Sequence, residues 1–145
     1  MSTFVNLSVG SALLLLLGAC SDDKAMVTCY DASVKKNPIS CLRLQIVPED
    51  QKMRAVLLRL YPFTEGCRQR LSVSYKSGIV CNSAYNAPQK ALSNFPNSYL
   101  NMEIRKGFTL QYSYYIDLDH KPTAYDLKRG FSRLSKELNI VAVSQ

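Results

Sequence analysis

The residues of this chain best suited to acid–base chemistry lie around its single histidine. His120 has Asp117 and Asp119 as close neighbours in the sequence, and a carboxylate beside an imidazole can orient the ring for proton transfer. His120 also lies immediately before Lys121-Pro122, where an alternating apolar pattern gives way to a helical one. We therefore expect a solvated loop histidine here rather than a catalytic base.

No catalytic or metal-binding motif accompanies this histidine in the sequence. The chain lacks the Gly-x-Ser-x-Gly, His-Glu-x-x-His and glycine-rich phosphate-loop patterns, and it has no catalytic Cys–His pairing. Asp117, Asp119 and Asp126 give neither a calcium-loop spacing nor an obvious carboxylate dyad. The sequence therefore predicts that the protein is not an enzyme and has no cofactor and no metal.

A cysteine near the amino end has a different kind of chemistry. The apolar stretch from Phe4 ends in Leu17-Gly18-Ala19-Cys20, and such a stretch followed by small residues is typical of a secretory signal. The order and position of these four residues resemble the lipobox of bacterial lipoproteins, which signal peptidase II cleaves. The alternative is a buried N-terminal helix that happens to contain Cys20.

The lipobox resemblance implies a signal peptide at 1–19 and acylation of Cys20, with several acyl chains giving durable anchoring. It also implies export to the outer membrane, facing the periplasm, because Ser21 stands where the inner-membrane retention signal has Asp. We expect residues 20–26 to be a tether and residues 27–145 to form one domain.

Four cysteines remain after Cys20, and an even number in an exported chain indicates two disulfides. Of the three pairings that four thiols allow, we favour Cys29 with Cys41 and Cys67 with Cys81, because each pair brackets a short segment. A metal site is the competing interpretation. It is disfavoured because no spacing is Cys-x-x-Cys and only one histidine is available.

Most of the remaining chain has the period-two pattern of strands with one buried face. The clearest run is 108–118, in which Phe108 and every second residue after it are apolar or Tyr, and the Lys106-Gly107 step joins it to an alternating run at 100–104. Further strands are predicted at 42–46, 54–61, 71–75 and 79–82. A long loop is predicted at 83–98, with one helical turn at 89–92.

The last part of the chain changes to helical spacing. From Pro122 onward the chain has apolar residues at helical spacing, and Asn139 is suited to the helix end. The predicted stripe consists of Ala124, Leu127, Phe131, Leu134 and Leu138. We therefore expect a mainly β domain, an antiparallel sandwich of six to eight strands with one C-terminal amphipathic helix.

Two groups of residues are candidates for binding. Arg129, Arg133 and Lys136 would form a positive stripe on the outer face of the helix, although a merely solvated face is the simpler interpretation. Tyr99 and Tyr115 fall on the outward register of their strands, where a large ring with a polar tip is suited to an interface.

The composition and the predicted location in the cell envelope together predict a binding function. The formal net charge is +7, and every charged side chain lies after Cys20, so the domain suits an acidic partner. Nucleic acid is not expected for an exported lipoprotein. We expect a membrane-anchored accessory or docking protein, similar in layout to pilotins, with a protein partner in the envelope. The alternative is a periplasmic immunity or inhibitor lipoprotein that neutralises a toxin or hydrolase, and the neighbouring genes would discriminate between the two.

Overall fold

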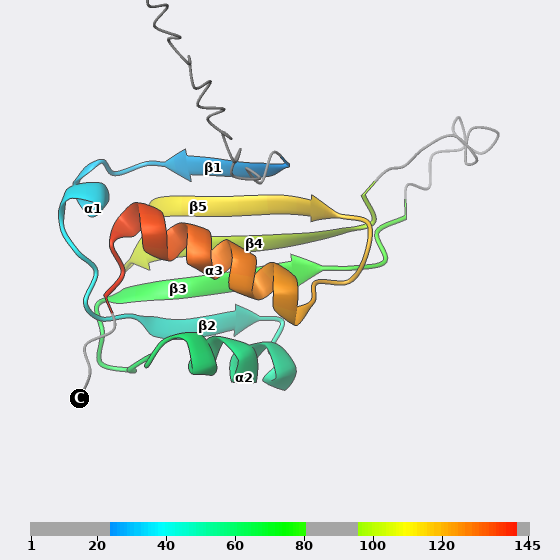
Figure 1. The fold of residues 1–145 in the computed structure, drawn as a ribbon, viewed down its shortest axis with the longest axis horizontal. Helices are drawn as coiled ribbons and strands as arrows, with labels where there is room; N and C mark the ends of the chain where they lie inside the picture. Colours follow the sequence, from blue (N-terminus) through cyan, green and yellow to red (C-terminus); the bar gives the residue numbers. More distant parts are fainter. Residues whose placement is uncertain (1–23, 81–95, 142–145) are drawn as a thin grey trace, which may run out of the picture.

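The computed structural model describes residues 24–80 and 96–141. They form one five-stranded sheet with helices packed on one of its faces (Figure 1). In chain order the elements are β1 (Ala25–Cys29), α1 (Ser33–Lys36), β2 (Arg43–Val47), α2 (Gln51–Leu60), β3 (Gln69–Lys76), β4 (Ser98–Lys106), β5 (Thr109–Leu118) and α3 (Ala124–Leu138).

The predicted β-rich fold is confirmed, but its details differ from the prediction. The strand order is β1-β5-β4-β3-β2, and β2 runs parallel to β3 whereas the other three pairings are antiparallel. The predicted six to eight strands and the second sheet of a sandwich are not confirmed. In the described part of the chain, α2 and α3 form the layer that covers the sheet (Figure 1). The sheet is therefore mixed. Helices cover one of its faces, and no helix or strand within 24–80 and 96–141 covers the other, which we call the open face.

Helix α2 replaces the strand that was predicted at 54–61. The Asp50 carboxylate accepts hydrogen bonds from the backbone N–H groups of Lys52 and Met53, which caps the helix at its start. Met53 and Leu57 are four residues apart and are both buried, so the buried positions follow a helical period. The prediction was wrong because a short apolar run has no unambiguous period. Helix α2 also makes the crossover that a parallel β2–β3 pair requires.

Helix α3 confirms the predicted C-terminal helix. Of the predicted stripe, Leu127, Phe131, Leu134 and Leu138 are buried, whereas Ala124, at the first position of the helix, is exposed. Asn139 ends the helix in the left-handed conformation with φ of 48°. Gly130 faces the sheet: a Cβ at this position would lie 3.0 Å from Met102 Sδ and 3.0 Å from Tyr114 Cε1. The missing side chain lets α3 approach β4 and β5 closely.

The predicted hairpin between β4 and β5 is also confirmed, and Gly107 supplies the positive φ of 59° that its turn requires. Phe108 was expected on the buried face of the strand. It instead lies in the turn and is 97% exposed, because β5 begins only at Thr109. Of the predicted strand at 79–82, Ile79 and Val80 are not in a strand, and the remainder lies outside the described residues, as does the predicted turn at 89–92.

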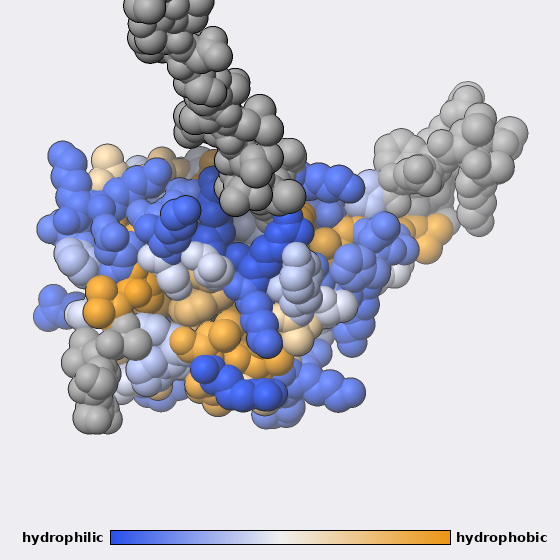
Figure 2. All heavy atoms as spheres, viewed as in Figure 1, coloured by the Kyte–Doolittle hydropathy of each residue, from blue (hydrophilic) through white to orange (hydrophobic). Residues whose placement is uncertain are grey.

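The core lies between the sheet and helices α2 and α3. Tyr61, Phe63 and Phe131 form an aromatic cluster there, with ring centroids 5.0–6.1 Å apart. On the helix-covered side, hydrophobic atoms gather over α2, whereas the outer side of α3 is mostly hydrophilic (Figure 2). Leu58 of α2 is half exposed.

Candidate functional site

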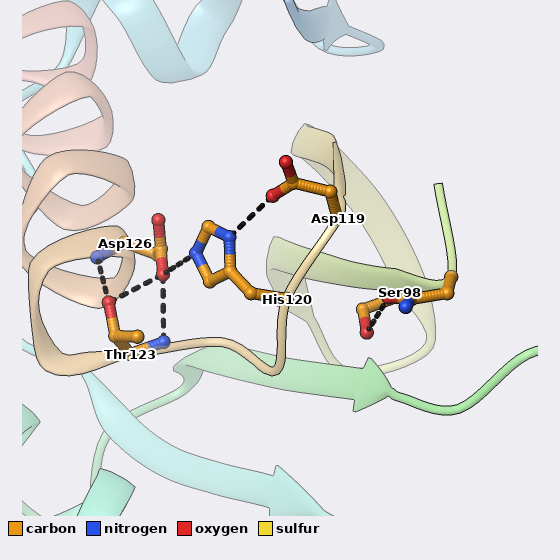
Figure 3. Close-up of polar contacts among 6 residues, drawn as sticks. Ser98, Asp119, His120, Thr123 and Asp126 are labelled. Atoms are coloured by element: carbon orange, nitrogen blue, oxygen red, sulfur yellow. Dashed lines mark hydrogen bonds and ion pairs between the residues drawn. The ribbon is translucent and has the colours of Figure 1, made fainter. Parts of the chain in front are cut away.

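The single histidine joins the β5–α3 loop to the first turn of α3 (Figure 3). His120 Nδ1 lies 2.7 Å from an Asp119 carboxylate oxygen, and His120 Nε2 lies 3.1 Å from Asp126 Oδ2. Thr123 donates to the same Asp126 oxygen through its backbone N–H at 2.7 Å and through its hydroxyl at 2.6 Å. The Asp126 backbone N–H in turn donates to Thr123 Oγ1, which completes a capping box.

The electrostatics of this cluster favour ionised groups. The hydrogen bond that His120 makes to the Asp119 carboxylate, and then the one to the Asp126 carboxylate, raises the pKa of His120 above its ordinary value. Burial acts to raise the pKa of Asp126, but the hydrogen bonds from Thr123 and His120 outweigh it and hold that pKa below the ordinary value. The contacts in the cluster therefore stabilise the protonated form of His120 and the ionised form of Asp126.

The order of these groups differs from that of a nucleophilic triad. In such a triad a hydroxyl contacts one ring nitrogen of the histidine and a carboxylate contacts the other. Here both ring nitrogens contact carboxylates, and the Thr123 hydroxyl donates to Asp126 instead of contacting His120. Ser98 contacts Asn97. The geometry assigns His120 to helix capping, and it also shows that Asp117 is not one of its partners: Asp117 accepts from the Tyr115 hydroxyl.

The two tyrosines predicted on the outward register of the sheet lie together. The Tyr99 and Tyr115 rings stack with centroids 5.6 Å apart and planes inclined by 24°. Both are half-buried, and Met26, the β1 neighbour of Tyr115, is 62% exposed. Burial and the hydrogen bond to Asp117 raise the pKa of Tyr115 to about 12. Tyr115 thus stays a neutral phenol on the open face of the sheet.

The predicted cationic stripe lies on α3, on the other side of the sheet from the two tyrosines. Arg129 lies over the ring of Tyr125, 5.8 Å from its centroid, and Arg133 forms an ion pair with Glu137. Lys136 is exposed. The stripe is therefore partly neutralised, and it does not form one site with the tyrosines.

Glu137 helps to hold α3 against the sheet and α1, and the sequence patterns did not predict this role. The Glu137 carboxylate accepts from the Tyr112 hydroxyl at 2.7 Å, pairs with Arg133, and lies 3.7 Å from Lys35 Nζ. Burial acts to raise the pKa of Glu137, but these partners lower it overall. The Arg133–Glu137 spacing of four residues was a detectable signal, whereas Tyr112 and Lys35 are brought there only by the fold.

The disulfide pairing differs from the one we favoured. Cys41 is bonded to Cys67, with a Cα–Cα distance of 5.5 Å, so the predicted Cys29–Cys41 and Cys67–Cys81 pairings are wrong. The bond joins the segment before β2 to the segment before β3, and parallel strands place these two segments side by side. Cys29 is a half-buried thiol, and Cys20 and Cys81 lie outside the described residues.

The sheet register also bears on a bond between Cys29 and Cys81. Cys29 lies in the row of Tyr112 and Ile104, whereas Ile79 hydrogen-bonds to Asn97, seven residues before Ile104 along an extended chain. At about 3.3 Å per residue, the two ends of the sheet are separated by roughly 23 Å. The register therefore disfavours a bond between Cys29 and a cysteine that closely follows Ile79 in the sequence.

Two further properties concern ligands and membranes. Within 24–80 and 96–141, no group of three or more His, Cys, Asp or Glu side chains could hold a metal ion. In the same ranges, no helix combines the length and the apolar character that crossing a membrane requires.

Comparison with known protein families, with curated proteins and with solved structures found no match for this chain.

Proposed function

We propose that this chain is a non-enzymatic, lipid-anchored protein of the cell envelope that holds a protein-binding surface at the periplasmic side of the outer membrane. The observation that carries the proposal is the run Leu17-Gly18-Ala19-Cys20 at the end of an apolar stretch. Acylation of Cys20 attaches the domain to a membrane.

The Cys41–Cys67 bond supports an extracytoplasmic location. Disulfides persist in oxidising compartments such as the periplasm and are rare in the cytosol. This one lies beside the start of the parallel β2–β3 pair, and Cys67 is buried. It is therefore placed as a structural bond, which fits an exported domain.

The short distance in sequence between Cys20 and β1 supports close attachment. Strand β1 begins at Ala25, within the stretch predicted as a tether. Five residues span at most about 17 Å. An acylated Cys20 would hold the amino end of β1 within that distance of the membrane surface.

We assign the binding surface to the open face around the stacked Tyr99–Tyr115 pair and its neighbour Met26. Two aromatic rings that are already ordered by stacking lose little conformational entropy on binding, and each adds a polar hydroxyl to an apolar contact area. Tyrosines of this kind are frequent hot spots of protein interfaces.

The anchoring is tested by comparing the wild-type protein with a Cys20→Ala variant in the native host. We expect the wild type in the membrane fraction, with an intact mass that lacks residues 1–19 and includes acyl chains. The variant is expected to lose both the acyl chains and the membrane association. Cys29→Ala is the matched control and should behave as the wild type. A wild-type protein that retains Met1 and carries no acyl chain would refute the anchoring.

The binding surface is tested by in-cell cross-linking of the tagged, lipidated protein, followed by mass spectrometry. A Tyr99→Ala/Tyr115→Ala variant is expected to lose the partner, whereas Arg129→Ala/Lys136→Ala, on the opposite side of the domain, should retain it. If only the Arg129→Ala/Lys136→Ala variant lost the partner, the binding surface would lie on α3 instead. That outcome, with an acidic toxin or hydrolase as the partner, would support the immunity function instead.

A further inference from the structure

Three arginines form one row across the open face of the sheet. Arg70 of β3 stands opposite Arg43 of β2 and also opposite Arg105 of β4. In its strand each arginine directly adjoins a buried leucine or isoleucine of the core, so the three arginine side chains project from the open face. The row lies at the end of the sheet where β2 and β3 begin and β4 ends (Figure 1). Neighbouring strands are about 4.8 Å apart, so this arginine row spans roughly 10 Å.

The charges of the arginine row are mostly unbalanced. Arg105 pairs with Glu103 at 2.6 Å, and Arg70 donates to the Ser72 hydroxyl at 3.2 Å. In the part of the chain that the structure describes, neither Arg70 nor Arg43 forms an ion pair. Like charges directly opposite each other destabilise a sheet. The free protein therefore keeps an arrangement that costs it stability.

The rest of the sequence adds little negative charge near the arginine row. The loop before β3 has one charge of each sign, Glu65 and Arg68. The range 81–95 contains no Asp or Glu. Asp22 and Asp23 precede β1, which begins at the end of the sheet away from the row. The excess positive charge of the row is thus available to an anionic group from outside the chain.

A protein that contacts the stacked tyrosines can cover the arginine row as well. Tyr115 stands opposite Asn101, four residues before Arg105 on β4, so the row begins about 13 Å from Tyr115 along the sheet. A standard interface buries about 800 Å² on each partner, roughly 30 Å across, so one interface of this size covers both. Charges that enter an interface without a partner lose their hydration at a cost in free energy. The protein on this face must therefore supply negative groups at the row.

We propose that the arginine row binds an acidic segment of the protein partner, whose Asp and Glu carboxylates pair with the guanidinium groups. This inference rests on the proposed protein-binding function. The fork of N–H donors on a guanidinium matches the two oxygens of a carboxylate, which makes arginine well suited to this contact.

The charge pattern of the open face also sets the direction in which the partner lies. Around the tyrosine pair the face has one charge of each sign, because Tyr99 stands between Lys76 and Asp117. The excess positive charge lies at the other end, in the arginine row. The acidic segment of the partner therefore lies toward the start of β2 and β3, and the less charged part of the partner lies on the tyrosines.

The occupant is tested with a photo-cross-linking amino acid at position 45 of the full, lipidated chain in its native host. Gln45 is exposed and shares the open face with Arg43, two residues away. We expect mass spectrometry to find this position cross-linked to a partner segment rich in Asp and Glu. The same probe at Ser132, exposed on α3, is the control and should not capture this segment. A neutral or basic segment, a cross-link to phospholipid or lipopolysaccharide, or no cross-link would overturn the proposal.

Removing charge from the row tests whether the arginines are responsible. Arg43→Gln/Arg70→Gln should lower capture from position 45 by at least about tenfold, since each lost group made charge-assisted hydrogen bonds. Lys52→Gln/Arg59→Gln makes the same change in net charge on α2, and its capture should stay within about twofold of the wild type. Undiminished capture by the double arginine variant would overturn the proposal. Equal losses in the two double variants would also overturn it, because they would show an effect of net charge alone.

Two further measurements separate this proposal from a structural role and from the proposed function. In urea unfolding, Arg43→Gln/Arg70→Gln should be at least as stable as the wild type, because like charges no longer stand opposite each other. A less stable variant would show that the arginines serve the fold and would overturn the proposal. If Tyr99→Ala/Tyr115→Ala loses the partner and the double arginine variant retains it, the protein-binding function stands and only the acidic segment is refuted.

Discussion

Replacing Gly130 by alanine tests the contact between α3 and the sheet. In an exposed helix interior this change stabilises by about 1 kcal/mol. Here the new Cβ would lie 3.0 Å from Met102 Sδ and 3.0 Å from Tyr114 Cε1, closer than ordinary van der Waals contact. Overpacking of a well-packed core costs about 1–3 kcal/mol. The thioether of Met102 can adjust, but the buried Tyr114 ring has little room to move, so the cost outweighs the gain.

We therefore expect Gly130→Ala to lower the free energy of unfolding by about 1 kcal/mol, the overpacking cost less the gain in helix propensity. Urea unfolding in a Cys20→Ala background, without reductant, measures this quantity. Ser132→Ala, at an exposed position of the same helix, is the control and should be neutral or stabilising by a few tenths of a kcal/mol. In a Met102→Ala background the Gly130→Ala cost should shrink, because one of the two close neighbours is gone. Stabilisation of about 1 kcal/mol by Gly130→Ala alone would show that α3 is not in close contact with the sheet.

Three further results are expected. The stabilisation by the contacts of His120 with Asp119 and Asp126 should be present near pH 6.5, the ordinary histidine pKa, and should fall as pH rises through the raised folded pKa; the unfolding free energies of wild type and His120→Asn should therefore converge as the pH rises above that value, and a difference that does not change with pH would contradict these contacts. Cys41→Ser should cost about 3.5 kcal/mol in urea unfolding, because the bond to Cys67 closes a loop with a sequence separation of 26; an unchanged midpoint would contradict a structural role. Peptide mapping without reductant should find no Cys29–Cys81 bond within one chain, and finding one would contradict the sheet register.

The sequence predicted those elements whose residues repeat with one clear period. The alternation through β4 and β5 and the helical stripe of α3 both specify which face is buried, and the structure has them there. The stretch at 54–61 was ambiguous because Val56, Leu57 and Leu58 are all apolar. Asp50, three residues before Met53, was the local signal for a helix, since its carboxylate caps α2.

Sequence patterns did not predict the contacts between segments that are far apart in the chain. Pairing of Cys41 with Cys67 follows from the parallel β2–β3 crossover, which in turn depends on α2 being a helix. The predicted pairs were chosen because each brackets a short segment, and that criterion takes no account of a crossover that brings Cys41 beside Cys67.

The capping box and the histidine illustrate the same limit at the candidate site. Thr123 and Asp126 have the three-residue spacing of a capping box, which is visible in the sequence before the apolar stripe of α3. Asp126 also accepts a hydrogen bond from His120. This contact depends on the path of the loop between β5 and α3, which is specific to the fold. Both ring nitrogens of His120 already contact carboxylates, so a proton-transfer role for His120 would require it to release Asp119 or Asp126. The same contacts that hold the helix in place thus direct the search for function away from the histidine and toward the open face of the sheet.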